Sequence, residues 1–360
     1  MSSIAIINGS PVNSGIYVSM RPYCMVLKQL GYQVAWYQCA DDSAQLGLLE
    51  KEDHLITGFG IPLEDLRMGF NRFIKFPLSL RNIETEIRII ADPTMINALD
   101  RNAKSVVFFH DVIPLTKFGS KFSSKVMFRY ALFRLGEVDK IIVTSNYTKE
   151  QLIYNEVDGK KISIIPYTTR FLPRSDHIEK SLLRLTEARE LNVTYVAADR
   201  PHKCIELFLE IAKTASTSTG AIKFNFHLIS KLRKSTSEKL EKMCLDNFFL
   251  HSSVESMENV YDMTDVLLHT SLFEGFGLPI LESMCFGIPI IARCCPPVKE
   301  LLDGNGILVE SGFADKWLSV LDSLTNIDTY RRFASLSLKR STNFSHANFR
   351  TNVLDAFESL

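Results

Sequence analysis

The sequence lacks both an excess of charge and an apolar stretch long enough to cross a bilayer. Its 360 residues carry 41 Lys and Arg against 41 Asp and Glu, a formal net charge of +0, so no general attraction to nucleic acid is expected. Its uncharged apolar stretches fall short of the roughly 18 residues of a membrane span. No basic segment precedes the short apolar run at the N-terminus, so we expect neither a signal peptide nor a transmembrane helix.

Cysteine pairs and a dinucleotide fingerprint are also missing. The seven cysteines are an odd number, and none stands in the C-x-x-C spacing of a zinc site. This pattern favours a reduced, cytoplasmic protein. The loop between the first expected strand and the first expected helix has no G-x-G-x-x-G, which disfavours a nicotinamide-dependent dehydrogenase.

Strand-length apolar runs alternate with helical patterns along most of the chain. Hydrophobic residues at 46% and charged residues at 23% are globular values, and 360 residues suit two domains of about 150 to 180 residues. Expected strands are residues 3–7, 33–37, 54–56, 87–91, 105–109, 139–144, 161–166, 192–197, 224–230, 248–250, 265–269, 288–292 and 307–309. Expected helices are residues 20–30, 123–135, 145–153, 204–213, 257–263, 279–286 and 344–360.

This alternation predicts an α/β protein with two doubly wound domains. The first domain is expected at residues 1–170 and the second at residues 171–340, with a linker at about residues 167–175 and a last helix in residues 341–360.

The most informative stretch is residues 265–292, which reads as strand, loop, helix and strand. Gly275 and Gly277 let the loop backbone approach a ligand closely, and the next helix presents the positive end of its dipole. A diphosphate suits that position. Glu274 at the start of the loop and Glu282 in the first helical turn can accept hydrogen bonds from hydroxyl groups in one crevice. An ordinary turn before a helix explains each of these residues singly.

Two cations lie in another expected strand-to-helix loop, after the strand at residues 192–197. Arg200 and Lys203 would stand at the carboxyl edge of a parallel sheet, where they can neutralise a departing diphosphate. The alternative is surface charge, but cations are mildly unfavourable at a helix start because of the dipole. Because surface charge alone would be unfavourable at this position, a functional role is favoured for the two cations.

In the N-terminal half, His110 directly follows the strand expected at residues 105–109. One ring nitrogen can bond to a sugar hydroxyl or phosphate while Asp111 or a backbone carbonyl fixes the other. A histidine that satisfies local backbone is an equal alternative. Gly15, in the loop at residues 8–17, can bring backbone N–H groups to a phosphate or an acceptor, or can simply make a turn.

The central stretch resembles the carboxylate signature of the glycosyltransferase family 4 enzymes, in which two glutamates are separated by seven residues. The resemblance rests on Glu274, Gly275, Phe276, Gly277, Leu278, Pro279, Glu282, Gly287 and Pro289. It extends over most of the chain and implies the GT-B architecture, with two Rossmann-like domains facing across a cleft. It also implies a transfer that retains the anomeric configuration.

The resemblance assigns a role to each candidate residue. Arg200 and Lys203 would bind the donor phosphates, and Glu282 would accept hydrogen bonds from ribose hydroxyls. Glu274 would position the sugar together with backbone N–H groups. Those groups belong to Gly275, Phe276, Gly277 and Leu278. No D-x-D triplet stands beside these residues, so the two cations are expected to replace a metal ion, and no cofactor is expected besides the nucleotide-diphosphate sugar.

The N-terminal half is similar to the family in fewer places. The HDVIPL phrase at residues 110–115 resembles a loop whose histidine, here His110, contacts the donor sugar. The loop that carries Gly15 borders the cleft in family members. Tyr167 and Thr168 stand where the family usually has Asn-Gly.

These inferences predict a retaining hexosyltransferase of glycan or polysaccharide biosynthesis. GDP-mannose is the preferred donor, because HDVIPL is most similar to mannosyltransferase relatives, and UDP-glucose is the next. The acceptor is expected to be a hydroxyl of a glycan or of a lipid-linked glycan. Two alternatives remain: an epimerase or hydrolase of nucleotide sugars on the same fold, and a non-catalytic protein that binds nucleotide sugars.

A basic stripe beside apolar residues suggests peripheral contact with an anionic membrane at its cytoplasmic face. Lys117, Lys121, Lys125 and Arg129 recur every four residues, and residues 71–81 mix aromatic and basic side chains similarly. A core-facing apolar stripe with a solvated basic edge explains the same pattern.

Overall fold

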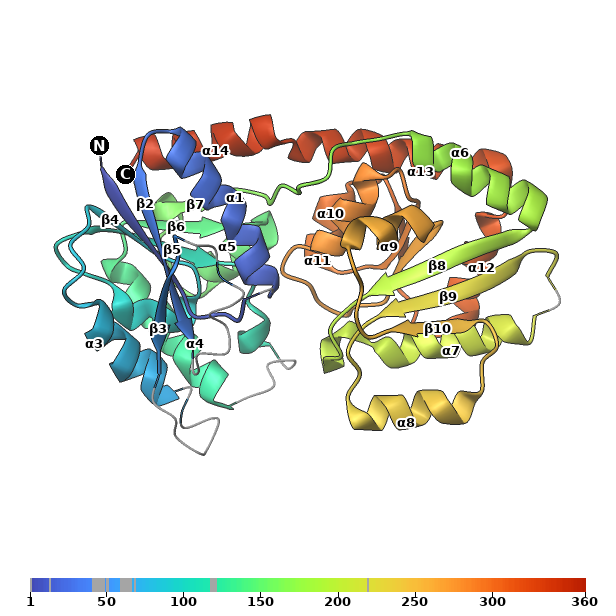
Figure 1. Ribbon diagram of the computed structural model, residues 1–360, viewed down its shortest axis with the longest axis horizontal. Coiled ribbons are helices and arrows are strands. Elements are labelled where there is room, and N and C mark those ends of the chain that lie inside the picture. The colour runs from blue at the N-terminus through green and yellow to red at the C-terminus, as the bar shows by residue number, and fades with distance from the viewer. Residues whose placement is uncertain are drawn as a thin grey trace. The chain divides into compact units, whose positions relative to one another are not determined.

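The computed structural model describes residues 2–12, 14–40, 49, 52–58, 67, 69–116, 122–218 and 220–360, apart from the side chains of residues 122–124. The chain divides into two compact units (Figure 1). The first comprises Met1–Thr168 and His346–Leu360, and the second comprises Thr169–Ser345. The sequence placed the change of domain at residue 170 and the start of the last segment at residue 341.

The first unit is built on a parallel sheet. Its strands are β1 (Ser3–Asn8), β2 (Gln33–Ala40), β3 (His54–Thr57), β4 (Ile87–Ile90), β5 (Lys104–Phe109), β6 (Lys140–Val143) and β7 (Ile162–Ile164). Among the described residues their order is β3-β2-β1-β4-β5-β6-β7, and neighbouring strands are parallel. Strand β5 is buried from Ser105 to Phe109, as expected where helices cover both faces. The order reverses at β1, and doubly wound sheets bind ligands at the carboxyl edge of such a point.

The helices of the first unit include one that begins earlier than expected. They are α1 (Gly15–Gln29), α3 (Phe76–Leu80), α4 (Phe122–Arg134), α5 (Asn146–Tyr154) and α14 (His346–Glu358). The sequence placed the start of α1 at residue 20, but the Ser14 side chain accepts a hydrogen bond from Tyr17 N and caps the helix there. The placement of Gly15 in a loop was therefore wrong, because it is the first residue of α1.

The C-terminal helix α14 packs within the first unit. The ring of Phe349 contacts the ring of Tyr23 in α1, with centroids 4.6 Å apart and planes at 72°. Lys140 Nζ, from β6, donates to Ala356 O at 2.8 Å. These contacts bring the end of the chain to the sheet that the N-terminal residues begin.

The second unit contains another parallel sheet. Its strands are β8 (Glu190–Val196), β9 (Lys223–Ile229), β10 (Phe248–His251), β11 (Val266–His269), β12 (Ile290–Arg293) and β13 (Ile307–Val309). In the described part of the chain the order is β10-β9-β8-β11-β12-β13, again parallel throughout. The order reverses at β8, so the loops that follow β8 and β11 start beside the switch point. All the strands expected from the sequence are present in the two sheets.

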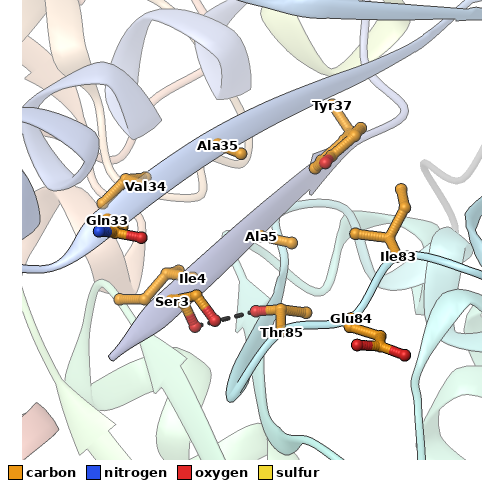
Figure 2. A pocket seen from close by; sticks show the side chains of 10 residues that line it. All are labelled: Ser3, Ile4, Ala5, Gln33, Val34, Ala35, Tyr37, Ile83, Glu84 and Thr85. Atoms are coloured by element: carbon orange, nitrogen blue, oxygen red, sulfur yellow. Dashed lines mark hydrogen bonds between the residues drawn. The ribbon is translucent and has the colours of Figure 1, made fainter. Parts of the chain in front are cut away.

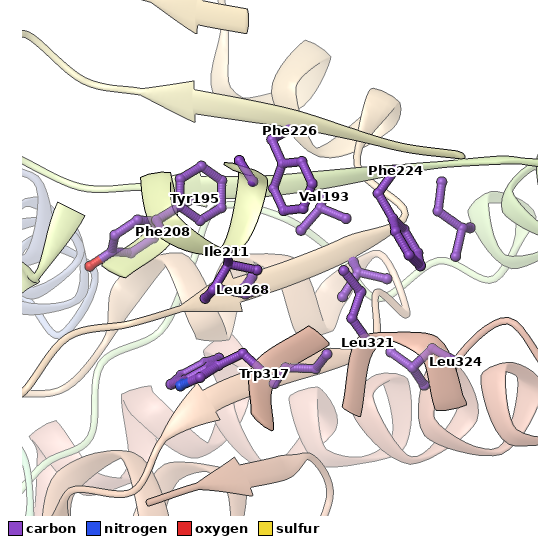
Figure 3. Close-up of a cluster of buried hydrophobic side chains, with 14 of the residues drawn as sticks. Val193, Tyr195, Phe208, Ile211, Phe224, Phe226, Leu268, Trp317, Leu321 and Leu324 are labelled. Atoms are coloured by element: carbon purple, nitrogen blue, oxygen red, sulfur yellow. The ribbon is translucent and has the colours of Figure 1, made fainter. Parts of the chain in front are cut away.

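Helices cover the second sheet and fill its core. They are α6 (Asp176–Leu183), α7 (Ile205–Ser216), α8 (Lys234–Met243), α9 (Met257–Met263), α10 (Leu278–Cys285), α11 (Pro296–Leu302), α12 (Ala314–Ser323) and α13 (Ile327–Ser341). One buried cluster is shown in Figure 3 and includes Val193, Tyr195, Phe208, Ile211, Phe224, Phe226, Leu268, Trp317, Leu321 and Leu324. Strands β8, β9 and β11 thus meet α7 and α12 in one core, which fixes the ends of β8 and β11.

Other features lie away from the candidate residues. A hollow of about 330 Å³ at the amino-terminal ends of β1 and β2 is shown in Figure 2, where Thr85 Oγ1 donates to Ser3 O at 2.9 Å. Because it lies at the opposite end of these strands from the carboxyl edge, we assign no substrate to it. None of the helices in the described residues is long and apolar enough to cross a membrane. All seven cysteines are described, and none forms a disulfide.

Candidate functional site

The candidate residues of the second unit gather where two neighbouring strands end. Strands β8 and β11 pair in parallel at the switch point, so the loops after them start side by side. Leu272 N, in the second loop, donates to His202 O in the first loop at 2.7 Å. The Tyr195 hydroxyl, from β8, donates to Lys203 O at 2.6 Å. These bonds fix the backbone of Lys203 against the loop that leads to Glu274.

Lys203 and Glu274 form an ion pair in which both carboxylate oxygens are engaged. Lys203 Nζ lies 2.7 Å from Oε1 and 2.7 Å from Oε2, and the side chains are 19% and 7% exposed. His269, the last residue of β11, places Nε2 2.7 Å from Oε1 of the same carboxylate and is also buried. The sequence predicted Lys203 and Glu274 at one sheet edge, but it did not identify His269.

The environment of Glu274 keeps its carboxylate ionised. Burial alone would raise its pKa, but the positive charge of Lys203 and the hydrogen bond from His269 lower the pKa well below the usual glutamate range. Glu274 is therefore an acceptor of hydrogen bonds at neutral pH, as needed to bind sugar hydroxyls.

Helix α10 begins immediately after this loop without a side-chain cap. Its N-cap, Gly277, has a φ of 103°, a conformation that favours glycine. The N-cap has no side chain that could bond to the first-turn N–H groups, and no acidic residue lies in that turn. The positive end of α10, with Gly275 and Leu278 half-buried beside it, is thus available to an anion. Phe276 anchors the loop, since its ring packs against Phe344 with centroids 5.9 Å apart.

Arg200 is the other predicted cation of this edge. It is exposed and immediately precedes the 3-10 turn Pro201–Lys203. Its neighbour Asp199 is already bonded to Arg233, whose backbone N and Nη2 donate at 2.8 and 2.9 Å. Within the described residues the Arg200 side chain makes no hydrogen bond, so its charge is open to a ligand.

Glu282 differs from Glu274 in position and in electrostatics. Because α10 begins at Leu278, Glu282 lies beyond the first turn, and its predicted place in that turn was wrong. Its Oε2 accepts a hydrogen bond from the Tyr261 hydroxyl at 2.6 Å. Burial raises its pKa above the ordinary value, although Tyr261 and the charge of Arg170 oppose this shift. The two glutamates of the motif thus have separate partners.

His110 lies in the first unit, after β5, and both of its ring nitrogens are engaged there. Nε2 lies 2.6 Å from Ala91 O, and Nδ1 bonds to the Tyr167 hydroxyl. A carbonyl only accepts, so Nε2 carries the proton and Nδ1 accepts from Tyr167. Burial lowers the pKa of His110, which keeps the ring neutral. A backbone carbonyl fixes one nitrogen as predicted, whereas the nitrogen expected to face the sugar is bonded to Tyr167. Asp111 instead accepts from Ile113 N at 2.8 Å.

Gly15 also belongs to the first unit and begins α1 after its cap, Ser14. An added Cβ would meet nothing within 4 Å, and its φ is not positive, so the fold alone does not require glycine there. The N-terminal end of α1 nevertheless follows β1 at the switch point, where its backbone N–H groups can donate to a ligand.

Sequence reasoning missed three residues that organise the site. They are Tyr195, Tyr261 and His269, which lie in β8, in α9 and at the end of β11. Each was part of an apolar pattern typical of core residues. The position of His269 at the last residue of a strand before the glycine loop is the one signal that could have indicated it.

Part of the predicted basic stripe is outside the described residues. Lys117 and Lys121 are among these, whereas Lys125 and Arg129 lie on α4, where Val126 is exposed. Within the described chain no group of three or more His, Cys, Asp or Glu residues is placed to bind a metal ion.

Comparison with known proteins gives matches over most of both units. Residues 14–167 match the family described as Glycosyltransferase Family 4, and residues 190–325 match Glycosyl transferases group 1. The O-antigen chain mannosyltransferase RfbU of Salmonella typhimurium is 28% identical over 235 residues, which are 62% of this chain and 62% of that protein. The chain thus matches less than two thirds of the length of this relative.

Two solved structures are similar over nearly the whole chain. HepE of Anabaena, in complex with UDP and glucose, superposes with a TM-score of 0.77 at 15% identity, covering 100% of both chains. TarM of S. aureus superposes with a TM-score of 0.76 at 13% identity, covering 99% of this chain and 100% of that one. At these identities the likeness establishes the fold, and both neighbours have the GT-B architecture that the sequence predicted.

Proposed function

Because this chain belongs to the family 4 glycosyltransferases, we propose that it transfers a hexose from a nucleotide-diphosphate sugar to a hydroxyl of a glycan or a lipid-linked glycan. We propose further that the transfer retains the anomeric configuration and needs no metal ion. The observation that carries the proposal is the cluster of Lys203, Glu274 and His269 beside the uncapped start of α10.

The donor diphosphate binds at the positive end of α10. Backbone N–H groups of Gly277 and Leu278 and the helix dipole stabilise its charge. Arg200 and Lys203 contribute two positive charges, which stabilise the diphosphate as it leaves. Because Lys203 is bonded to Glu274 in the free protein, it exchanges this partner for a phosphate when the donor binds.

The sugar lies next to the diphosphate, where Glu274 accepts hydrogen bonds from its hydroxyls. Glu282 accepts from the ribose and is oriented for this by the Tyr261 hydroxyl. Backbone N–H groups from residue 275 onward complete the donor site, while Phe276 keeps the loop in place through Phe344.

Mannose from GDP-mannose is the preferred donor group. The Salmonella relative, an O-antigen chain mannosyltransferase, supports it, together with the HDVIPL phrase that begins at His110. UDP-glucose is the alternative, since the Anabaena neighbour was crystallised with UDP and glucose. The relative's role in O-antigen chains supports a glycan acceptor.

A binding screen followed by a transfer assay tests the proposal. Purified protein is melted with GDP, UDP, GDP-mannose and UDP-glucose without added metal. A ligand at 100 times its dissociation constant stabilises the native state by about 2.7 kcal/mol, which a melt detects. The donor that binds is then incubated with synthetic lipid-linked saccharides, and the anomeric configuration of the product is determined by NMR.

Each outcome points to one class of protein. Transfer to an acceptor with retained configuration supports the proposal. Free sugar or an epimerised sugar nucleotide, formed without an acceptor, indicates the hydrolase or epimerase. Binding without turnover on any acceptor indicates a non-catalytic protein, and no binding to any nucleotide contradicts the proposal.

We also propose that the first unit contacts an anionic membrane. A continuous helical segment covers residues 69–80 and ends with α3. It exposes Phe70, Ile74 and Leu78 at 36%, 44% and 61%, a spacing of four residues that places them on one face. Arg81 follows and is exposed. An apolar stripe next to a basic residue is typical of helices that lie in a membrane interface.

Flotation with neutral and anionic liposomes tests this contact. Wild type should float with the anionic vesicles, and the double variant Ile74→Glu, Leu78→Glu should remain at the bottom. Leu172→Glu is the control, because Leu172 is an exposed leucine of the second unit, at 77%. Failure of the wild type to float, or equal flotation of all three proteins, contradicts the contact.

A further inference from the structure

His269 occupies a position where an apolar residue would be expected. It follows Val266, Leu267 and Leu268 at the end of β11 and is 1% exposed. Its Nδ1 is buried and has no hydrogen-bond partner among the described residues. Leaving a polar atom unpaired in the interior costs free energy, so packing alone would favour leucine here. The interaction that a leucine could not make is the hydrogen bond from Nε2 to Glu274.

The hydrogen bond to Glu274 shows which ring nitrogen is the donor. An ionised carboxylate only accepts hydrogen bonds, so Nε2 must carry the proton that it shares with Glu274. His269 therefore donates from Nε2 to the carboxylate of Glu274.

Glu274 thus has two restraints of different stiffness. Lys203 reaches it through a flexible four-carbon side chain from the loop after β8. His269 reaches it from a strand, and its ring packs edge-on against Tyr195 with centroids 5.4 Å apart and planes at 84°. The hydroxyl of Tyr195 is in turn bonded to Lys203 O and near Ser271 Oγ, at 2.6 and 2.8 Å. The histidine is consequently the stiffer of the two restraints.

We propose that His269 is a positioning residue that keeps Glu274 directed at the donor sugar after Lys203 has turned to the diphosphate. This inference rests on the proposed function, in which Lys203 exchanges Glu274 for a phosphate. Once that exchange occurs, Lys203 no longer bonds to the carboxylate. Among the described residues, Nε2 of His269 is then the remaining side-chain donor to Glu274. Without it the carboxylate is free to rotate, and its contact with the sugar weakens while the diphosphate site stays intact.

The test compares His269→Leu with His269→Gln. Leucine fills the space and has no donor, whereas the amide nitrogen of glutamine can replace Nε2–H. Affinities are measured by calorimetry for GDP-mannose and GDP, or for UDP-glucose and UDP, whichever pair the wild type binds. Thermal melts of both variants accompany these measurements.

For His269→Leu we expect the affinity for the sugar nucleotide to fall about tenfold, as for loss of a hydrogen bond to a charged group, and the affinity for the nucleoside diphosphate to stay within twofold. The kcat for transfer should fall at least as much. His269→Gln should recover most of both losses. A merely structural role would weaken both ligands equally and would track the melting temperature.

Three results overturn the inference. They are an unchanged sugar-nucleotide affinity in His269→Leu, equal losses in the leucine and glutamine variants, and equal losses for the two ligands. If His269→Leu does not fold, the glutamine variant decides, because it must then retain sugar-nucleotide affinity within about threefold. If the wild type binds neither pair of ligands, the proposed function is refuted, and this inference with it. If the wild type binds and His269→Leu has the same affinities as the wild type, the inference alone is refuted.

Discussion

Replacing Glu274 with glutamine should tighten the binding of a nucleoside diphosphate while it lowers the rate of transfer. Lys203 Nζ lies 2.7 Å from each oxygen of Glu274 in the free protein. A diphosphate that binds through Lys203 must compete with this carboxylate and is also repelled by its charge. Glutamine preserves the size of the side chain and can still accept from His269, but it removes the charge.

The size of the effect follows from the pair that is broken. A hydrogen bond to a charged group contributes about 1.5–3 kcal/mol net, and about 1.4 kcal/mol changes an equilibrium tenfold. The Lys203 side chain is 19% exposed, so water screens part of this energy and the lower end of the range applies. We expect the dissociation constant of GDP or UDP to fall roughly tenfold in Glu274→Gln. Transfer should fall on the order of 10²-fold, because the sugar loses a charged acceptor.

Isothermal titration at constant ionic strength measures the first quantity, and steady-state transfer measures the second. Glu210→Gln is the matched control, because Glu210 is exposed on α7 and its replacement changes the net charge equally. The control should leave both quantities unchanged. A nucleoside diphosphate that binds Glu274→Gln no more tightly than wild type refutes the idea that Glu274 and the diphosphate compete for Lys203.

Four further predictions concern single features of the site. Lys203→Ala should lower transfer on the order of 10²-fold in steady-state assays, as for loss of a transition-state donor, and an unchanged rate would remove Lys203 from the mechanism. Glu282→Gln should keep the wild-type melting temperature at neutral pH. The pKa of Glu282 is raised in the folded protein, so its contribution to stability is complete at low pH and is lost as the pH rises through the folded pKa. The ionised carboxylate therefore adds no stability at neutral pH, and a large drop in the melting temperature of the variant would contradict this reasoning. Gly277→Ala should destabilise the protein by about 1–2 kcal/mol in denaturant titrations, because alanine is strained at a φ of 103°. Gly15→Ala is the control and should be neutral, so equal unfolding midpoints for the two variants would contradict this strain. Transfer should survive EDTA, and loss of activity that manganese restores would contradict a metal-independent reaction.

The strands were predictable because parallel strands buried on both faces are continuous apolar runs. Ser105–Phe109 and Val266–Leu268 are such runs and needed no tertiary information. Helix α13 was missed for the opposite reason. Its buried residues are Tyr330, Ala334, Ser337 and Ser341, so two buried serines interrupt the apolar stripe that the partly buried Phe333 and Leu338 help to form.

The candidate site was predictable as far as motif spacing goes. Glycines before a helix and glutamates seven residues apart identified the loop and α10. The partners of those glutamates come from tertiary structure: the hydroxyl that reaches Glu282 is 21 residues upstream, and the imidazole that reaches Glu274 ends an ordinary core strand. The same motif therefore contains one glutamate with a lowered pKa and one with a raised pKa, a contrast that spacing alone does not encode.

The departure of Tyr167 from the family pattern acquires a physical meaning in the first unit. Its hydroxyl donates to Nδ1 of His110, while Nε2 donates to Ala91 O, so the imidazole is neutral and fully bonded. Burial lowers the pKa of His110, and a cationic role at neutral pH is therefore disfavoured. For His110 to bond a sugar hydroxyl through Nδ1, the hydroxyl of Tyr167 has to leave first. The positive charge that the proposed transfer needs thus comes from Arg200, Lys203 and the start of α10, and His110 can contribute only a neutral hydrogen bond.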